Sequence, residues 1–189
     1  MGNSSSKKSP HVLLVGLDNA GKTSLLYNLT NKNIDTVQPT SPQNPFEKIK
    51  VQNQKLIIWD LSGKESFRNK WRHYFVGNDI VIFVIDSTDR DRLEESKEEL
   101  AKLLNEPLLR DSPFLILLTK NDLANQMTQQ DIEDQININT ISPSPQNANE
   151  ANRKIKFFST SSLNGSNIKE SFAWIVEQHK ERVKREKKK

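Results

Sequence analysis

The sequence is poor in several features that mark whole classes of protein. It has no cysteine, which excludes disulfides, thiolate metal sites and cysteine nucleophiles and is typical of a reducing compartment. No run approaches the roughly 18 apolar residues of a membrane span, and the chain starts without an apolar secretory segment. Apolar residues fill only 34% of the 189 positions. These shortages predict one soluble domain with a small hydrophobic core and some segments that lie outside this core.

The body of the chain also lacks an excess of basic over acidic residues. The whole sequence carries 28 basic and 24 acidic residues, but without residues 1–9 and 179–189 the counts are 19 and 22. The body is therefore mildly acidic, and the basic excess lies in the two tails. A basic groove of the kind that a nucleic-acid enzyme needs is not indicated, so no nucleic-acid partner is expected for the folded part.

Strand and helix patterns alternate along the chain. Short apolar runs predict buried strands at residues 11–17, 80–86, 114–119 and 155–159. A turn between two further strand patterns predicts a hairpin formed by residues 46–52 and 55–60. Helical patterns fall at residues 22–32, 65–75, 89–104, 128–136 and 166–184. This order predicts an α/β fold with a mostly parallel six-stranded sheet, one antiparallel edge strand and helices on both faces.

The strongest motif lies between the first strand and the first helix. Residues 16–23 read GLDNAGKT and fit the phosphate-binding pattern G-x-x-x-x-G-K-S/T. Glycines let the backbone N–H groups point at phosphate oxygens, the lysine reaches the β- and γ-phosphates, and the threonine hydroxyl ligates Mg²⁺. The expected nucleotide-binding residues of this loop are Gly16, Leu17, Asp18, Asn19, Ala20, Gly21, Lys22, Thr23 and Ser24.

Two later strands end in residues that suit the same ligand. Asp60 ends the run LIIWD, where a carboxylate can hold Mg²⁺ directly or through water, and Gly63 lets a backbone N–H approach the γ-phosphate. Residues 119–122 read TKND after another strand. The carboxylate of Asp122 can accept from guanine N1–H and the exocyclic amine, a donor pair that adenine lacks, while the stem of Lys120 packs over the purine.

Read together, these motifs resemble a known family. GLDNAGKTS, Pro39–Thr40, WDLSG, WRHYF, VIDSTDRDR and TKND are similar to the small GTPases of the ADP-ribosylation-factor and Arf-like family, over about residues 11–180. The resemblance implies a GTP-binding domain that cycles between GDP and GTP with Mg²⁺ and recruits effectors in membrane or vesicle trafficking. An exchange factor and an activating protein would be further partners.

The resemblance also assigns individual residues. Thr40 matches the first-switch threonine that binds Mg²⁺ and the γ-phosphate, and Asp60 and Gly63 match the second switch. Ser161 and Ser162 match the segment whose backbone touches the guanine O6, and Thr119 is a further expected nucleotide-binding residue. In the effector-facing aromatic patch, Trp59 and Tyr74 match two members and Phe46 is a candidate third, with core packing as the alternative reading of all three. Trp174 of the last helix is expected to be core.

The chain departs from the family pattern at several positions. Lys64 stands where the family has the glutamine that positions the attacking water, and Ser62 replaces a glycine just before it. Thr119 replaces the usual asparagine, as it does in other small GTPases. The residues after Thr40 read SPQNP instead of an apolar run, and one residue is inserted before Asp60. Whether the hairpin shifts register with the nucleotide therefore stays open.

Both termini carry membrane-attachment signals. The chain begins MGNSSSK, which fits an N-myristoylation signal at Gly2, within a disordered lead-in over residues 1–10. A basic tail over residues 181–189, with Lys180 just before it, is a candidate second signal for an anionic membrane surface. A solvated helix end, a nuclear-import patch and an RNA-binding patch are the alternatives. Residues 137–153, rich in Asn, Pro and Ser, are expected to form a mobile insertion.

Three functions remain in view from the sequence. The first is a guanine-nucleotide switch at cytoplasmic membrane faces, with the Golgi or another endomembrane expected. Its catalytic set would be Lys22, Thr40 and Gly63, and GTP hydrolysis would be slow because of Lys64. The second is a non-hydrolysing GTP-bound scaffold, which Lys64 favours. The third is a nucleic-acid-associated GTPase that uses its basic tail, which the acidic body disfavours.

Overall fold

The computed structural model describes residues 9–33, 36, 46–142 and 153–186. Gly2, Thr40, the SPQNP segment and the last three residues of the basic tail lie outside these ranges, so the predictions that rest on them stay predictions.

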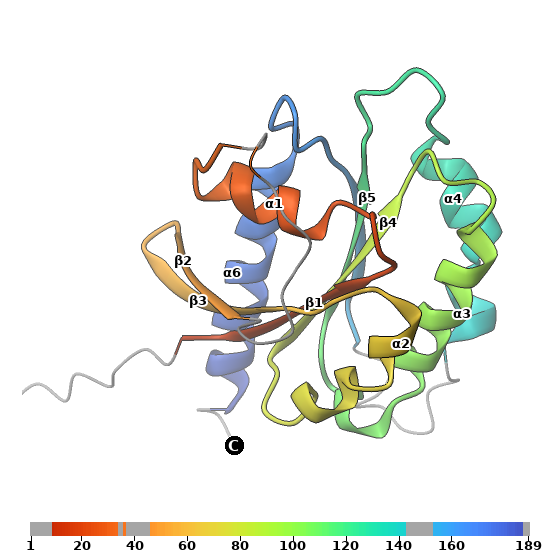
Figure 1. Cartoon of the computed structure of the whole chain (residues 1–189). Coiled ribbons are helices and arrows are strands. Elements are labelled where there is room, and N and C mark those ends of the chain that lie inside the picture. Colours follow the sequence, from red (N-terminus) through yellow and green to blue (C-terminus); the bar gives the residue numbers. More distant parts are fainter. Residues whose placement is uncertain (1–8, 34–35, 37–45, 143–152, 187–189) are drawn as a thin grey trace, which may run out of the picture.

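A single six-stranded sheet forms the centre of the molecule (Figure 1), with the strand order β2-β3-β1-β4-β5-β6. β1 pairs in parallel with β3 and β4, β4 with β5, and β5 with β6, whereas β2 pairs antiparallel with β3 at one edge. The predicted fold class is thereby confirmed. The strand bounds are β1 His11–Gly16, β2 Phe46–Val51, β3 Gln54–Asp60, β4 Ile80–Asp86, β5 Phe114–Thr119 and β6 Ile155–Ser159.

Helices cover both faces of this sheet (Figure 1). Within the described ranges they are α1 Lys22–Leu29, α2 Glu65–Arg68, α3 Leu93–Leu104, α4 Gln129–Ile136, α5 Ile138–Ile141 and α6 Ile168–Glu186, with short 3₁₀ turns η2 Trp71–Tyr74 and η3 Pro107–Leu109. α1 and α6 pack on one face, and α3 and α4 on the other.

The apolar runs of the central strands are buried on both sides, as parallel strands under two helical layers require. Val12 and Leu14 of β1 belong to the cluster that contains α1 and α6 residues, and Leu13 and Val15 belong to the cluster with α3 and α4. Trp174 lies in the first of these clusters with 8% of its surface exposed, which confirms its expected role in the core.

Three predicted segments differ in detail. Residues 65–75 form α2 and η2 instead of one helix, because Lys70 and His73 donate to carbonyls three residues earlier and tighten the chain. α3 starts at Leu93 instead of residue 89, since Asp89 accepts from the Arg92 N–H in a turn that precedes the helix. The expected insertion at 137–153 opens with α5, and its residues 143–152 lie outside the described ranges.

The hairpin turn fixes how β2 lies on β3. Only Gln52 and Asn53 separate the two strands, and both have positive φ, 46° and 64°. Two such residues in a two-residue loop form a type I′ turn, whose twist matches that of the paired strands. The register that follows sets Phe46 opposite Trp59 and Lys50 opposite Lys55.

Candidate functional site

The loops that carry the sequence motifs meet at one edge of the sheet. β1, β3, β4, β5 and β6 are parallel, so their carboxyl ends lie on the same side. β1 connects onward to one side of the sheet and β4 to the other, which makes this edge the topological switch point where open α/β sheets bind ligands. The Thr119 hydroxyl donates to the Ala20 carbonyl at 2.7 Å, and the Asn121 N–H donates to the Thr160 carbonyl at 3.1 Å. Hydrogen bonds therefore link the loops after β1, β5 and β6.

The loop after β1 takes a backbone path that only glycine tolerates at its two ends. Gly16 has φ 139°, and a Cβ there would lie 2.3 Å from the Val84 carbonyl oxygen. Gly21 has φ 88° and forms the N-cap of α1. α1 therefore begins directly after this loop, and a helix N-terminus favours an anion.

Lys22 is held in position within this loop. Its Nζ donates to the carbonyl of Gly16 at 3.0 Å and to that of Leu17 at 2.7 Å. An ammonium has three protons, so these two bonds leave one to donate to an anion. The side chain is 6% exposed, and burial lowers its pKa from 10.5 to about 8, a loss that nearby Asp60 and Asp18 only partly offset. Phosphate oxygens next to Lys22 would add the negative charge that is needed to keep this buried ammonium protonated.

Thr23 and Asp60, the two described residues expected at Mg²⁺, lie in contact next to the same loop. The Thr23 hydroxyl donates to Asp60 Oδ2 at 2.9 Å. Hydroxyl and carboxylate oxygens are donors that Mg²⁺ prefers, and Mg²⁺ usually takes only one or two protein ligands together with phosphates and water. These two residues therefore fit a Mg²⁺ that shares its shell with phosphates and water.

Gly63 lies directly against the phosphate loop. A Cβ at this position would come within 2.3 Å of the Gly16 carbonyl oxygen and the Leu17 carbonyl carbon, so no larger residue fits without movement. The neighbouring carbonyls are fixed by side chains: Trp71 Nε1 donates to Ser62 O at 2.9 Å, and Arg68 Nε donates to Gly63 O at 2.8 Å. The backbone expected to approach the γ-phosphate is thus held rigidly.

Lys64 is the exposed N-cap residue of α2. Its backbone is extended, with φ −61° and ψ 136°, so the chain turns here from the strand end into the helix. Because Gly63 is fixed against the phosphate loop, the backbone of Lys64 is also held beside that loop.

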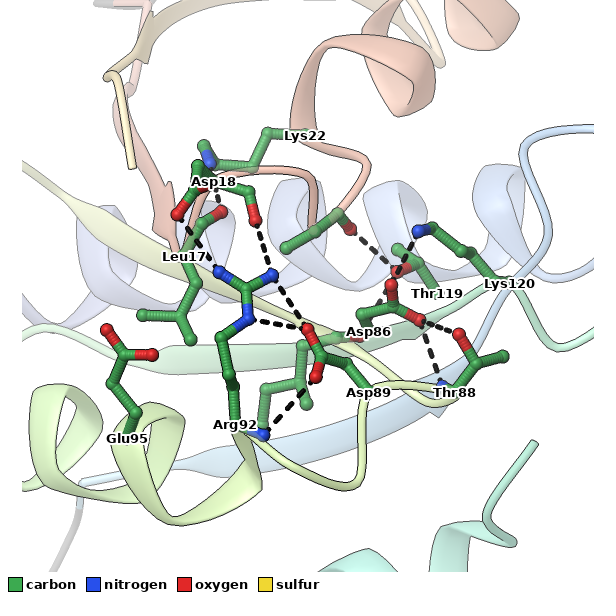
Figure 2. A network of polar contacts seen from close by, with 12 residues as sticks. Leu17, Asp18, Lys22, Asp86, Thr88, Asp89, Arg92, Glu95, Thr119 and Lys120 are labelled. Atoms are coloured by element: carbon green, nitrogen blue, oxygen red, sulfur yellow. Dashed lines mark hydrogen bonds and ion pairs between the residues drawn. The ribbon is translucent and has the colours of Figure 1, made fainter. Parts of the chain in front are cut away.

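The TKND segment is positioned by buried contacts. Thr119 lies under the phosphate loop and donates to Ala20 O, and Lys120 takes a left-handed backbone with φ 59°. Lys120 Nζ pairs with Asp86 Oδ2 at 2.5 Å (Figure 2). Burial alone raises the pKa of the Asp86 carboxyl, but hydrogen bonds from Lys120 and Thr88 outweigh it and hold the pKa below its ordinary value.

The residues expected to contact the guanine base differ in exposure. Asp122 is exposed, so its carboxylate is open to a ligand. Ser161 is buried, and its hydroxyl accepts from the N–H groups of Leu163 and Asn164, both at 3.2 Å. The carbonyl of Ser162 accepts from the Asn28 side chain of α1 at 2.9 Å. The loop after β6 is therefore tied to the helix that follows the phosphate loop.

Sequence reasoning missed an arginine that clamps the phosphate loop. Figure 2 shows the Arg92 guanidinium between Asp18 and Asp89. It donates to Asp18 Oδ1 at 3.1 Å, to the Asp18 carbonyl at 3.2 Å and to Asp89 Oδ2 at 2.7 Å. Arg92 and Asp18 are 74 positions apart, so no local pattern predicts the contact. Asp86 was also missed, although it ends an apolar strand as Asp60 does.

A second arginine joins the segment after β3 to α3 and to the phosphate loop. The side chain of Arg68 is 9% exposed and pairs with Glu95 at 2.7 Å and, at 3.8 Å each, with Glu99 and Asp18. Together with its bond to Gly63, these contacts make Arg68 the central cation between three parts of the site.

The three expected patch aromatics do come together, outside the phosphate-facing loops. The rings of Phe46 and Trp59 are 5.4 Å apart between centroids, and those of Trp59 and Tyr74 are 5.2 Å apart. Phe46 is 40% exposed, and Trp59 and Tyr74 are half-buried. We call Phe46, Trp59 and Tyr74 the aromatic patch.

Comparison with known proteins agrees with this geometry. The chain is similar in structure to the Arl6/BBS3 small GTPase of Trypanosoma brucei, solved with a bound nucleotide analogue, GppNp. The two share 26% sequence identity with a TM-score of 0.79, over 92% of this chain and 99% of the other. The model of the ADP-ribosylation factor family matches residues 2–179. The chain belongs to the ADP-ribosylation factor family of small GTPases.

Proposed function

We propose that this GTP-binding switch protein of the Arf family acts in membrane or vesicle trafficking and stays GTP-bound for long periods after loading. The observation that carries the second half of the proposal is Lys64, which follows the rigidly held Gly63 at the site where the family has glutamine. The hydrolysis of GTP needs a water aligned with the γ-phosphate. A glutamine carbonyl accepts from that water, whereas a lysine ammonium has three donors and no acceptor.

The nucleotide would be held by the phosphate loop, the two switches and the segments expected to read the base. In this proposal Lys22 and the N–H groups of residues 16–24 bind the phosphates, Gly63 offers its N–H to the γ-phosphate, and Asp122 reads guanine with support from Thr119, Lys120, Ser161 and Ser162. Thr23 and Thr40 ligate Mg²⁺, and Asp60 does so through water. When bound, Mg²⁺ neutralises charge on the β- and γ-phosphates.

Effectors would bind at the aromatic patch next to the switches. Its rings are adjacent and partly exposed, and Phe46 lies in β2, Trp59 in β3 and Tyr74 in η2. The segment that contains Gly63 and Lys64 joins β3 to η2. A nucleotide-dependent change in that segment would therefore move Tyr74 relative to Trp59. This is how GTP would order an effector surface and GDP release it.

Peripheral membrane attachment completes the proposal. Among the helices in the described ranges, none has the length and apolar content to cross a bilayer. Myristoylation at Gly2 gives only weak anchoring, and the basic residues from Lys180 to the end of the chain would add attraction to an anionic leaflet. Gly2→Ala protein that stayed fully on membranes in cells would overturn this part.

Single-turnover hydrolysis tests the role of Lys64. Lys64→Gln is expected to raise the rate by about tenfold or more, which is about 1.4 kcal/mol of barrier. Lys70→Gln removes another exposed lysine of the same segment and is expected to leave the rate unchanged. Equal rates for the wild type and Lys64→Gln, with and without an activating protein, would show that another group positions the water.

A second function, the non-hydrolysing scaffold, rests on the same lysine. An ammonium at this position can pair with the γ-phosphate in the ground state, which tightens GTP binding without lowering the barrier. Wild-type protein that shows no turnover even with an activating protein, while it still binds effectors, would favour the scaffold over the slow switch.

A further inference from the structure

Three lysines share one face of the edge hairpin with part of the aromatic patch. Successive side chains of a strand point to opposite faces, and Ile49 and Val51 of β2 are buried in the cluster that contains α6. Phe46, Lys48 and Lys50 therefore point to the other face. The register sets Lys50 opposite Lys55, and Phe46 opposite Trp59. We call Lys48, Lys50 and Lys55 the lysine face.

The charge of the lysine face is not neutralised by the described part of the molecule. All three lysines are exposed, and none has an ion pair with a residue in the described ranges. The one acidic residue of β2, Glu47, points to the opposite face and pairs with Lys32 at 2.9 Å. Lys50 and Lys55 are directly opposite each other, an arrangement that costs stability when the charges are alike.

The lysine face is continuous with the aromatic patch. Alternate residues of a strand are about 7 Å apart, so Lys48 is about 7 Å and Lys50 about 14 Å from Phe46 along β2. Apolar rings thus lie at one end of this surface and positive charge at the other. The chain without its tails has 22 acidic against 19 basic residues, so the sign of the charge is reversed here relative to the rest of the body.

We propose that the lysine face and the aromatic patch together bind an acidic protein segment, with an apolar side chain on the rings and carboxylates on Lys48, Lys50 and Lys55. This inference rests on the proposed effector binding at Trp59 and Tyr74 and specifies the class of partner. An anionic membrane is the less favoured occupant, because the basic end of α6 is the expected membrane contact and α6 packs against the opposite face of β2.

A charge reversal that preserves the hairpin tests the proposal. Lys50→Glu with Lys55→Glu replaces one like-charged cross-strand pair by another, so the stability of the hairpin changes little. Lysines on an edge strand also hinder unwanted sheet pairing, and glutamates would do the same. Lys156→Glu with Lys169→Glu is the matched control, since both lysines are exposed, on β6 and α6, and lie outside the lysine face.

The probe is a random peptide library selected on wild-type protein loaded with a non-hydrolysable GTP analogue. Enriched peptides are expected to carry Asp or Glu beside an aromatic or aliphatic residue. Their affinity should fall about tenfold or more on the Lys50/Lys55 variant, stay within twofold on the control, and weaken as salt rises. Enriched peptides without an acidic excess, or with equal affinity for both variants, would overturn the inference.

Two further measurements separate the other outcomes. Phosphatidylserine vesicles should bind the Lys50/Lys55 variant as well as the wild type; a loss of vesicle binding with unchanged peptide affinity would mean that lipid occupies this face, which contradicts the proposal. Binding of a fluorescent GDP analogue should be equal in all variants. If the wild type itself bound no guanine nucleotide, the proposed function would fail, whereas normal nucleotide binding with no acidic selection defeats only this inference.

Discussion

The hydroxyl of Thr23 donates to the carboxylate of Asp60 at 2.9 Å across a sequence separation of 37 residues. Thr23 lies in the first turn of α1, which follows β1, and Asp60 ends β3; the parallel pairing of β1 with β3 brings these two places together. The contact defines where the metal would sit relative to the phosphate loop, because one ligand is in that loop and the other is at the strand end beside it.

Loss of the Thr23 hydroxyl is expected to weaken Mg²⁺-dependent nucleotide retention. Thr23→Ala should speed nucleotide dissociation by at least about tenfold when Mg²⁺ is present, in line with the loss of a group that orients a metal. Thr23→Ser keeps the hydroxyl and serves as control. Stopped-flow release of a fluorescent GDP analogue, with Mg²⁺ and with EDTA, measures the effect; an identical loss in both conditions would mean that Thr23 does not act through the metal.

The base preference is expected to follow Asp122. Wild-type protein should bind GTP at least about 100-fold more tightly than ATP, since a site built to pair with a donor set rejects a base without it. Asp122→Asn should prefer xanthine nucleotides, because the amide of Asn can donate to the xanthine oxygen. Competition with GTP, ATP and XTP provides the readout, and equal wild-type affinity for ATP and GTP would contradict this reading of the site.

Nucleotide binding is expected to take up a proton at mildly alkaline pH. Burial lowers the pKa of Lys22 to about 8, and phosphates favour its charged form, so binding raises that pKa. At a pH equal to the free-state pKa, about half a proton should be taken up per nucleotide, and the affinity should fall as pH rises further. Calorimetry near pH 8 in buffers of different ionisation enthalpy counts the protons; no uptake there would refute the assignment to Lys22.

Arg68 is expected to stabilise the folded protein far more than its neighbour Arg72. Arg68→Ala leaves Glu95, Glu99 and the Gly63 carbonyl without their shared donor, which should cost about 1 to 3 kcal/mol. Arg72 is 69% exposed and lies 3.5 Å from Glu106, so Arg72→Ala should cost less than about 0.5 kcal/mol. Urea unfolding of both variants tests the difference, and similar free energies of unfolding would show that the Arg68 contacts are not needed.

The sequence predicted the sheet and the phosphate loop because both depend on local patterns. The strands Ile80–Asp86 and Phe114–Thr119 were placed at their observed bounds, since continuous apolar runs mark buried parallel strands. Asp60 ends β3, while Lys22 and Thr23 begin the helix after β1, and the parallel pairing of β1 with β3 must bring them together. Arg68 and Arg92 escaped prediction because long arginine side chains reach partners far along the chain. The lysine face could not be predicted either, because its lysines come together only through the strand register that the two-residue turn sets.

The nucleotide bound to freshly purified protein tests the central claim most directly. Extraction and chromatography are expected to yield roughly one guanine nucleotide per protein, with GTP in excess over GDP because turnover is slow. GDP as the main species would contradict the proposed effect of Lys64 and leave the guanine site intact. Adenine nucleotide as the bound species would contradict the account of the site itself.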